Sequence, residues 1–201
     1  MSRQSVLRLL KNDVVARVRF SVAVNNGTVT VNKETFTRVA TAIEDGRVNL
    51  TILPANEMPW NGSGAVYFST AGNANNPTYI SKYGAAIPAN SLFSRETFGR
   101  VEEGLLIHEA VHASLDLTSS TGIITTHEEA ACYIAEVLYN RRMGLSLTRI
   151  TEQIRVAALP VVNSIIRTGT ADATKYQDLV NTITAHPLYS GNATLCYTRD
   201  G

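Results

Sequence analysis

Short runs of alternating apolar and polar residues occupy the first ninety positions, as in strands that are buried on one face only. Asn25-Asn26-Gly27 separates two of these runs and predicts a hairpin turn between antiparallel strands. A segment with helical spacing follows, from a capping residue at Asn32 to Ile43, and it stops at Gly46. The pattern therefore predicts one helix and a small mixed or antiparallel sheet, with strands at 14–24, 28–31, 47–53, 65–70 and 78–81.

The second half of the chain has helical spacing instead. Residues 104–117 carry two apolar stripes, and Glu109 and Asp116 are their only formal charges, so we expect a helix buried in the core. A second helix is predicted from about His127 to Leu138, packed antiparallel to the first. A further helix is expected to reach Ala158, and Pro160 should kink or end it. Another helix is expected over residues 171–185.

These elements define an α+β fold in a single domain of residues 1–201. Its β-rich part covers residues 1–92. Its helical part covers residues 93–201 and contains the residues with the most distinctive chemistry.

That chemistry is the sequence His108-Glu109-Ala110-Val111-His112 in the first predicted core helix. Residues i and i+4 lie on one face of a helix, about 6 Å apart along its axis, so both imidazoles can reach one metal ion. Glu109 lies beside the pair, and a buried carboxylate needs a compensating partner such as a divalent cation. The alternative is a packed helix with two hydrogen-bonded core histidines.

A zinc site with hydrolytic activity uses three protein ligands and keeps one position open. The second predicted helix begins with His127-Glu128-Glu129, and Glu128 or Glu129 could face back toward the two histidines. The alternative for these carboxylates is a simpler one, in which they stabilise the helix dipole.

Two segments resemble the zincin metallopeptidases, and within them the gluzincins, over residues 101–140. HEAVHASLD is similar to the thermolysin-like pattern H-E-x-x-H-A-x-x-D, and EEAACY resembles the E-x-x-A start of the gluzincin ligand helix. The resemblance implies a minimal zincin, with Zn²⁺ bound by His108, His112 and Glu128, Glu109 as general base, and Asp116 orienting an imidazole. Only fifteen residues separate His112 from Glu128, fewer than in the large gluzincin families, so Glu129 and then His127 remain alternatives for the third ligand.

The activity that this resemblance implies is hydrolysis of a peptide bond in a peptide or protein substrate, with Glu109 taking a proton from the attacking water. In zincins an edge strand above the site binds the substrate backbone, and residues 65–70 are the candidate here; Trp60 either lines the substrate pocket or anchors its own loop. A donor is also needed for the oxyanion, and the candidates are His127, Tyr133, Tyr139, His186, Tyr189 and Tyr197.

Composition narrows the range of partners. The formal net charge is +1, with 17% charged residues, which argues against nucleic acid and anionic membranes as partners. No apolar stretch approaches the length of a membrane span or a signal-peptide core, so we expect a cytoplasmic protein. Cys132 and Cys196 are far apart in sequence; Cys132 is expected to pack as a small apolar residue, and a disulfide between the two is left open.

A second class of function is compatible with the same residues. The chain could be a non-catalytic zincin-like module, holding a structural metal or none and serving protein contacts. An effector or toxin with one protein target also fits the small size, although no sequence feature marks it. The retained Glu109 favours the hydrolase, because a module without activity does not need a general base.

Overall fold

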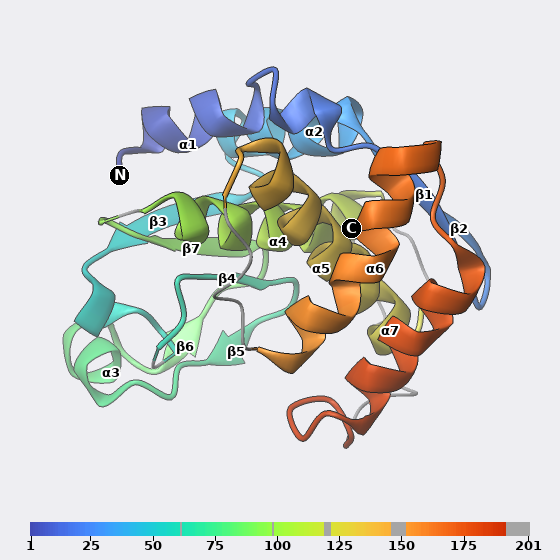
Figure 1. Ribbon diagram of the computed structural model, residues 1–201. Coiled ribbons are helices and arrows are strands. Elements are labelled where there is room, and N and C mark those ends of the chain that lie inside the picture. Colours follow the sequence, from blue (N-terminus) through green and yellow to red (C-terminus); the bar gives the residue numbers. More distant parts are fainter. Residues whose placement is uncertain (61, 98, 119–121, 146–151, 192–201) are drawn as a thin grey trace.

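The computed structural model describes residues 1–201 except 61, 98, 119–121, 146–151 and 192–201 (Figure 1). The fold is α+β, as predicted, with helices, small separate sheets and two short 3₁₀ turns, Val15–Arg17 and Ala55–Glu57. The helices are α1 Arg3–Leu10, α2 Lys33–Glu44, α3 Pro77–Tyr83, α4 Arg100–Leu117, α5 Thr125–Arg142, α6 Gln153–Thr168 and α7 Ala173–Ala185. The strands are β1 Phe20–Val24, β2 Gly27–Val31, β3 Asn49–Leu53, β4 Ala65–Phe68, β5 Gly72–Asn73, β6 Ala86–Ile87 and β7 Ser91–Arg95.

The hairpin predicted around Asn25-Asn26-Gly27 is confirmed. β1 and β2 pair antiparallel, with Phe20 opposite Val31 and Val22 opposite Val29, and all four side chains are buried. The first strand is shorter than the sequence suggests, because residues 15–17 form a 3₁₀ turn. The predicted helix after the hairpin is also confirmed: the Asn32 side chain accepts hydrogen bonds from two backbone N–H groups at the start of α2.

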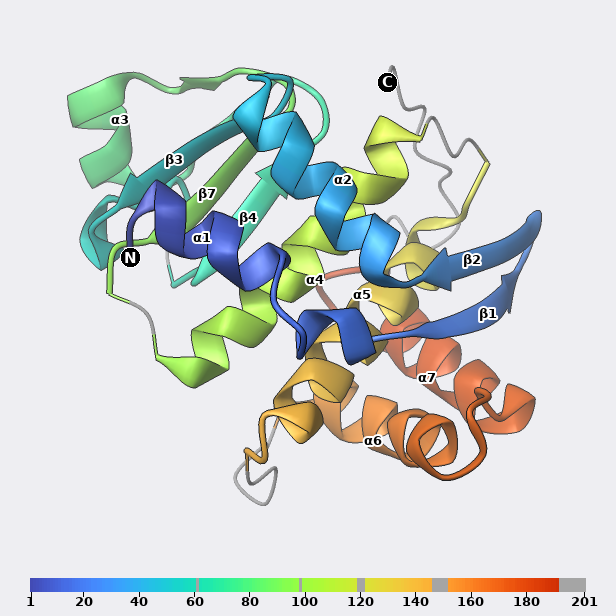
Figure 2. The same cartoon turned by 90° about the horizontal axis from the view of Figure 1, so that it is seen from above.

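A three-stranded mixed sheet lies beneath α1 and α2 (Figure 2). Its order is β3–β7–β4, with β3 parallel and β4 antiparallel to β7. β7 is missing from the sequence-based list because residues 91–94 are all buried, which removes the alternation of apolar and polar positions. The expected strands at 47–53 and 65–70 correspond to β3 and β4, and β4 forms one edge of the sheet.

One predicted strand is wrong. Residues 78–81 belong to helix α3, which begins at Pro77. The Asn76 side chain accepts a hydrogen bond from the Thr78 backbone N–H, and proline at the first helical position has a favourable backbone angle. These capping signals outweigh the β-forming residues that suggested a strand.

Helix α4 occupies the middle of the molecule, between α2, β4 and α5 (Figure 1). Leu106, Ile107, Ala110 and Val111 are fully buried, which confirms that this is a core helix. Helix α5 runs antiparallel to it, since Gly104 lies against Asn140 while His112 contacts Glu128. A Cβ atom on Gly104 would lie 2.7 Å from the Asn140 amide, so glycine allows the two helices to approach closely here.

The helices α6 and α7 cover the far side of α5 (Figure 1). Pro160 neither ends α6 nor defines its boundary: the helix continues to Thr168 and stops at Gly169, which has a φ of +81°. The exposed side of a helix tolerates proline better because water can satisfy the freed carbonyl. The helix predicted over 171–185 is confirmed as α7, capped by Asp172. Among the described helices, none combines the length and apolar character required to cross a bilayer.

An ion pair between the partly exposed Arg155 and the buried Glu136 joins α5 to α6. Arg155 Nε donates to Glu136 Oε1 at 2.5 Å, and Arg155 Nη2 donates to Glu136 Oε2 at 3.2 Å. The side chain of Glu136 is 1% exposed, and burial opposes its charged form, but His108 and then Arg155 hold the pKa of this carboxyl below its usual range. The carboxylate therefore depends on its partners to remain ionised inside the protein.

We expect Arg155→Met to destabilise the fold by about 3 kcal/mol, because it leaves the buried Glu136 carboxylate without its arginine. Urea unfolding of the metal-free protein measures this change. The double variant Glu136→Gln/Arg155→Met should recover part of the loss, since no unpaired charge is then buried. Equal stability of Arg155→Met and the wild type would contradict the structural role given to this pair.

Candidate metal centre

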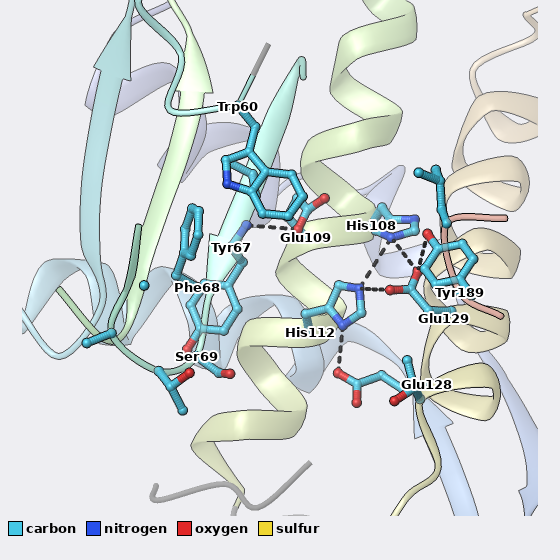
Figure 3. Close-up of a pocket in the computed structure, with 16 residues that line it drawn as sticks. Trp60, Tyr67, Phe68, Ser69, His108, Glu109, His112, Glu128, Glu129 and Tyr189 are labelled. Atoms are coloured by element: carbon cyan, nitrogen blue, oxygen red, sulfur yellow. Dashed lines mark hydrogen bonds and ion pairs between the residues drawn. The ribbon is translucent and has the colours of Figure 1, made fainter. Parts of the chain in front are cut away.

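The two histidines of the H-E-x-x-H sequence point from α4 toward α5 (Figure 3). His108 is 6% exposed, and His112 is partly buried beside it. Their Nε2 atoms lie 3.3 Å apart, with the rings tilted toward each other. The i, i+4 spacing therefore brings two imidazole nitrogens to one point, as the sequence predicts.

Glu129 of α5 closes this arrangement. Its Oε2 lies 3.3 Å from Nε2 of His108, and its Oε1 lies 3.5 Å from Nε2 of His112. The carboxylate thus faces both nitrogens at once.

These distances match the geometry of a bound zinc ion. Ligand nitrogens at about 2.0–2.1 Å from a tetrahedral zinc lie roughly 3.3 Å from each other, and a carboxylate oxygen lies at a similar distance from each of them. The Nε2–Nε2 distance of 3.3 Å matches this spacing, and the contacts of 3.3 and 3.5 Å to the two Glu129 oxygens are of similar length. The donors are also of the types that zinc prefers.

The other ring nitrogens face carboxylates. His112 Nδ1 is 2.6 Å from Glu128 Oε1, and His108 Nδ1 is 3.5 Å from Glu136 Oε2. A carboxylate beside Nδ1 favours the tautomer with the proton on that nitrogen, which leaves Nε2 with a lone pair. The hydrogen bond to Glu128 therefore orients His112 as a metal ligand requires, whereas Glu136 lies near Nδ1 of His108 at a distance too long for a hydrogen bond.

The residues predicted to assist the histidines have separate places. Glu128 lies at the Nδ1 side of His112, whereas Glu129 lies at the Nε2 side. Asp116 is buried and accepts a hydrogen bond from the Tyr67 hydroxyl at 2.7 Å; the positions beside the imidazoles that the sequence suggested for it are filled by Glu128 and Glu136. His127 pairs through Nδ1 with the Tyr176 hydroxyl at 2.9 Å.

The ionisable groups of this cluster shift the pKa values of one another. Burial opposes a charge on His108, yet Glu129 and Glu136 raise the pKa of this imidazole to about 10. Burial also opposes a charge on Glu129, but the two histidines hold its pKa well below the usual range. The carboxylates therefore favour positive charge on the imidazoles, and a bound cation would meet the same attraction.

Glu109 lies on another side of the histidines. Its Oε2 accepts a hydrogen bond of 2.9 Å from the Tyr67 backbone N–H, on the edge strand β4 (Figure 3). Burial raises the pKa of this carboxyl. Glu109 is thus placed between the histidines and the strand rather than among the groups that surround the two Nε2 atoms.

A cavity of about 430 Å³ opens over these groups. Residues 66–72 form one wall, so the predicted segment 65–70 does border the site. Trp60 and Phe68 give this wall an aromatic surface, with ring centroids 6.0 Å apart, and Trp60 lines the cavity rather than only anchoring a loop. Leu188 and Tyr189 form the opposite wall.

Of the six residues considered as donors for an oxyanion, Tyr189 borders the cavity. Its hydroxyl lies 3.2 Å from Glu129 Oε2 and 3.2 Å from the Tyr133 hydroxyl. Burial keeps the pKa of this phenol far above its usual range, so Tyr189 remains a donor. The other candidates are placed as follows: Tyr133 packs edge-on to His108, Tyr139 donates to Glu103, His127 pairs with Tyr176, His186 caps α7, and Tyr197 lies outside the described residues.

Two residues near the histidines were not assigned to the site from the sequence, Glu136 and Cys132. Both follow Glu128 and Glu129 at helical intervals, so the stripe 129, 132 and 136 of α5 faces α4. The spacing was a usable signal, because a helix that presents Glu129 also presents residues three and seven positions later.

Comparisons with known proteins provide no independent identification. We found no match to this chain among the models of protein families, among curated proteins or among solved structures.

Proposed function

We propose that this protein is a zinc-dependent hydrolase that cleaves peptide bonds, with the metal held by His108, His112 and Glu129. The observation that carries the proposal is the convergence of two Nε2 atoms and one carboxylate within 3.3 to 3.5 Å of one another. Zinc, when bound, acts as a Lewis acid toward a carbonyl and lowers the pKa of water. A general base and an aromatic cavity at the same place favour a reactive centre over a purely structural one.

The choice of Glu129 over Glu128 rests on which ring nitrogen each carboxylate faces. Glu129 approaches the Nε2 atoms of both histidines, whereas Glu128 contacts Nδ1 of His112 on the opposite side of the ring. One imidazole cannot bring both nitrogens to a single ion. We therefore assign Glu128 the task of orienting His112 and fixing its tautomer.

Glu109 is the general base in this proposal. It is partly buried, borders the cavity, and has a raised pKa that makes it a better proton acceptor than an exposed carboxylate. It takes the proton from the attacking water and delivers it to the leaving amine. The Tyr67 N–H fixes the position of the carboxylate while it does so.

Tyr189 supplies the donor for the oxyanion. Its hydroxyl lies at the cavity wall, within 3.2 Å of the Glu129 carboxylate, and stays protonated. A neutral phenol aimed at this point can donate to an oxygen on which negative charge develops.

The substrate is best accommodated as an extended chain along β4. This strand is at the edge of its sheet, and the Tyr67 N–H points away from β7 toward Glu109, so the outer edge of the strand faces the site. Main-chain hydrogen bonds along an edge strand hold a peptide in the extended form.

We expect the purified protein to bind one zinc ion per chain, and Glu129→Gln to weaken binding more than Glu128→Gln. Loss of a direct ligand should cost ~100-fold or more in affinity, and loss of an orienting partner roughly 10-fold. Elemental analysis and competition with a chromogenic chelator measure both quantities, and circular dichroism verifies the fold of each variant. The reverse order would move the third ligand to Glu128, and absence of zinc binding in the wild type would overturn the metal centre.

Zinc-loaded protein should cleave members of a fluorescence-quenched peptide library, and Glu109→Gln should lower kcat by roughly 10²–10⁴-fold. The amide can still accept the Tyr67 N–H, so the strand and the metal content should be unchanged. Glu102→Gln, at an acidic residue in the first turn of the same helix, is the matched control. Full activity in Glu109→Gln would remove this residue from the mechanism.

Tyr189→Phe should lower kcat by about 10²–10³-fold with little change in KM or zinc affinity, because the donor acts on the transition state. Tyr133→Phe removes the neighbouring hydroxyl and should have a smaller effect on kcat. Steady-state kinetics and a zinc titration separate these quantities. A variant with normal kcat and weakened zinc binding would show that the phenol only positions Glu129.

A further inference from the structure

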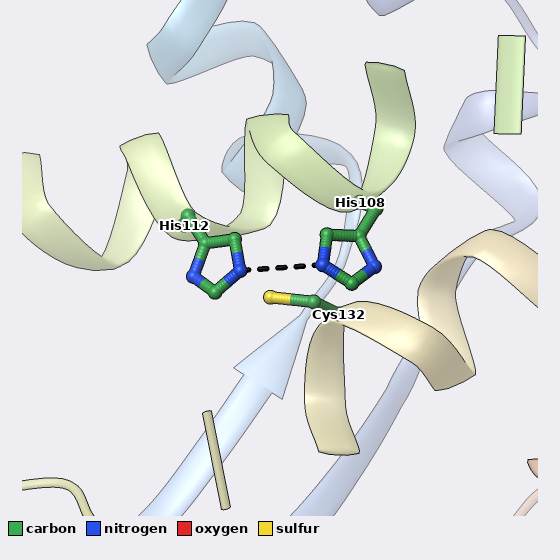
Figure 4. Close-up of side chains that lie close together, drawn as sticks. All are labelled: His108, His112 and Cys132. Carbon is green, nitrogen blue, oxygen red and sulfur yellow. Dashed lines mark hydrogen bonds between the residues drawn. The ribbon is translucent and has the colours of Figure 1, made fainter. Parts of the chain in front are cut away.

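Cys132 lies directly against the two histidines. It is on α5, three residues after Glu129, and is fully buried. The ligand atoms of His108, His112 and Cys132 all lie within 4.8 Å of one another. In Figure 4 the sulfur points from α5 toward the gap between the two imidazole rings.

We infer that Cys132 is a fourth ligand of the metal centre, binding as a thiolate behind His108, His112 and Glu129. Residues i and i+3 of a helix share a face, so Glu129 and Cys132 reach the same point from α5 as His108 and His112 reach it from α4. The inference rests on the proposed function, because it concerns the same metal ion.

The dimensions and the charge of the site agree with this assignment. Zinc binds sulfur at about 2.3 Å and imidazole nitrogen at about 2.0–2.1 Å, which places the two ligand atoms roughly 3.5 Å apart in a tetrahedron, inside the span of the cluster. Two neutral imidazoles, one carboxylate and one thiolate neutralise a divalent cation. A neutral set is the least costly way to bury the ion between two core helices.

The four donors occupy different sides of the centre. His108, His112 and Glu129 border the cavity, whereas Cys132 is not among the described residues that line it. The thiolate therefore approaches from the protein interior, and the side toward Glu109 and Tyr189 stays accessible to substrate. Zinc centres of hydrolases can expand to five ligands, so a fourth protein ligand on the interior side would not block the cavity side.

A sulfur ligand also determines which metals the site prefers. Thiolate favours zinc and similar soft or borderline ions and is a poor ligand for magnesium, calcium and manganese. The chain should therefore select zinc or cobalt even when magnesium is in large excess.

Cobalt(II) is the probe that tests this inference. The metal-free protein is titrated with cobalt and followed by absorbance, since thiolate ligation produces an intense near-ultraviolet charge-transfer band in addition to the visible bands of tetrahedral cobalt. Wild type and Cys196→Ser, the matched control at the other cysteine, should both show the charge-transfer band. Cys132→Ser should lose it, keep the visible bands, and bind zinc at least about 10-fold more weakly.

The outcomes separate this inference from the proposed function. Tetrahedral cobalt without the charge-transfer band in the wild type overturns the role of Cys132 and leaves the centre of His108, His112 and Glu129 intact. A band that disappears in Cys196→Ser instead also overturns it. Failure of the wild type to bind cobalt or zinc at all overturns both. If Cys132→Ser fails to fold, Cys132→Ala, which keeps a small buried side chain, replaces it in the same titration.

Discussion

The contact between α4 and α5 is the constraint on which the site depends. Each helix buries ionisable groups in the interface, imidazoles from α4 and carboxylates from α5, and neither set is stable inside a protein without the other. Gly104 lets the helices approach at one end, and the pair of His112 and Glu128 joins them at the other. These two contacts hold the helices at the spacing that lets Glu129 of α5 face the Nε2 atoms of both histidines.

This interface is supported from outside by a second layer. Glu136 lies between His108 and Arg155, so a cation on α6 balances a carboxylate that orients a histidine on α4. The arginine also lies over the Tyr133 ring, which in turn packs edge-on to His108. The helical C-terminal half therefore does more than complete the core, because its side chains pack around the imidazoles and restrict their orientation. A metal centre needs such support from the residues that surround its ligands.

Features of the fold and the candidate site could be predicted from the sequence where they depend on residues close together in the chain. His108, Glu109 and His112 are related by one turn of a single helix, so their arrangement follows from local periodicity, as do the hairpin at residues 25–27 and the capped start of α2. The position of Glu129 relative to Glu128 depends on the rotation of α5 against α4, which arises from packing between residues distant in sequence. Strand β7, buried on both faces, and the continuation of α6 through Pro160 also depend on tertiary environment rather than on pattern.

Tyr67 shows how the sheet is connected to the same helix. Its backbone N–H donates to Glu109 and its hydroxyl donates to Asp116, seven residues later and on the same face of α4. One residue of the edge strand thus contacts α4 at two points, two turns apart. Because Tyr67 contacts Glu109 from the strand edge itself, a peptide aligned along β4, as we propose, would lie at a fixed distance from Glu109. The buried Asp116 thereby ties the edge strand to α4, the helix that carries Glu109 and the two histidines.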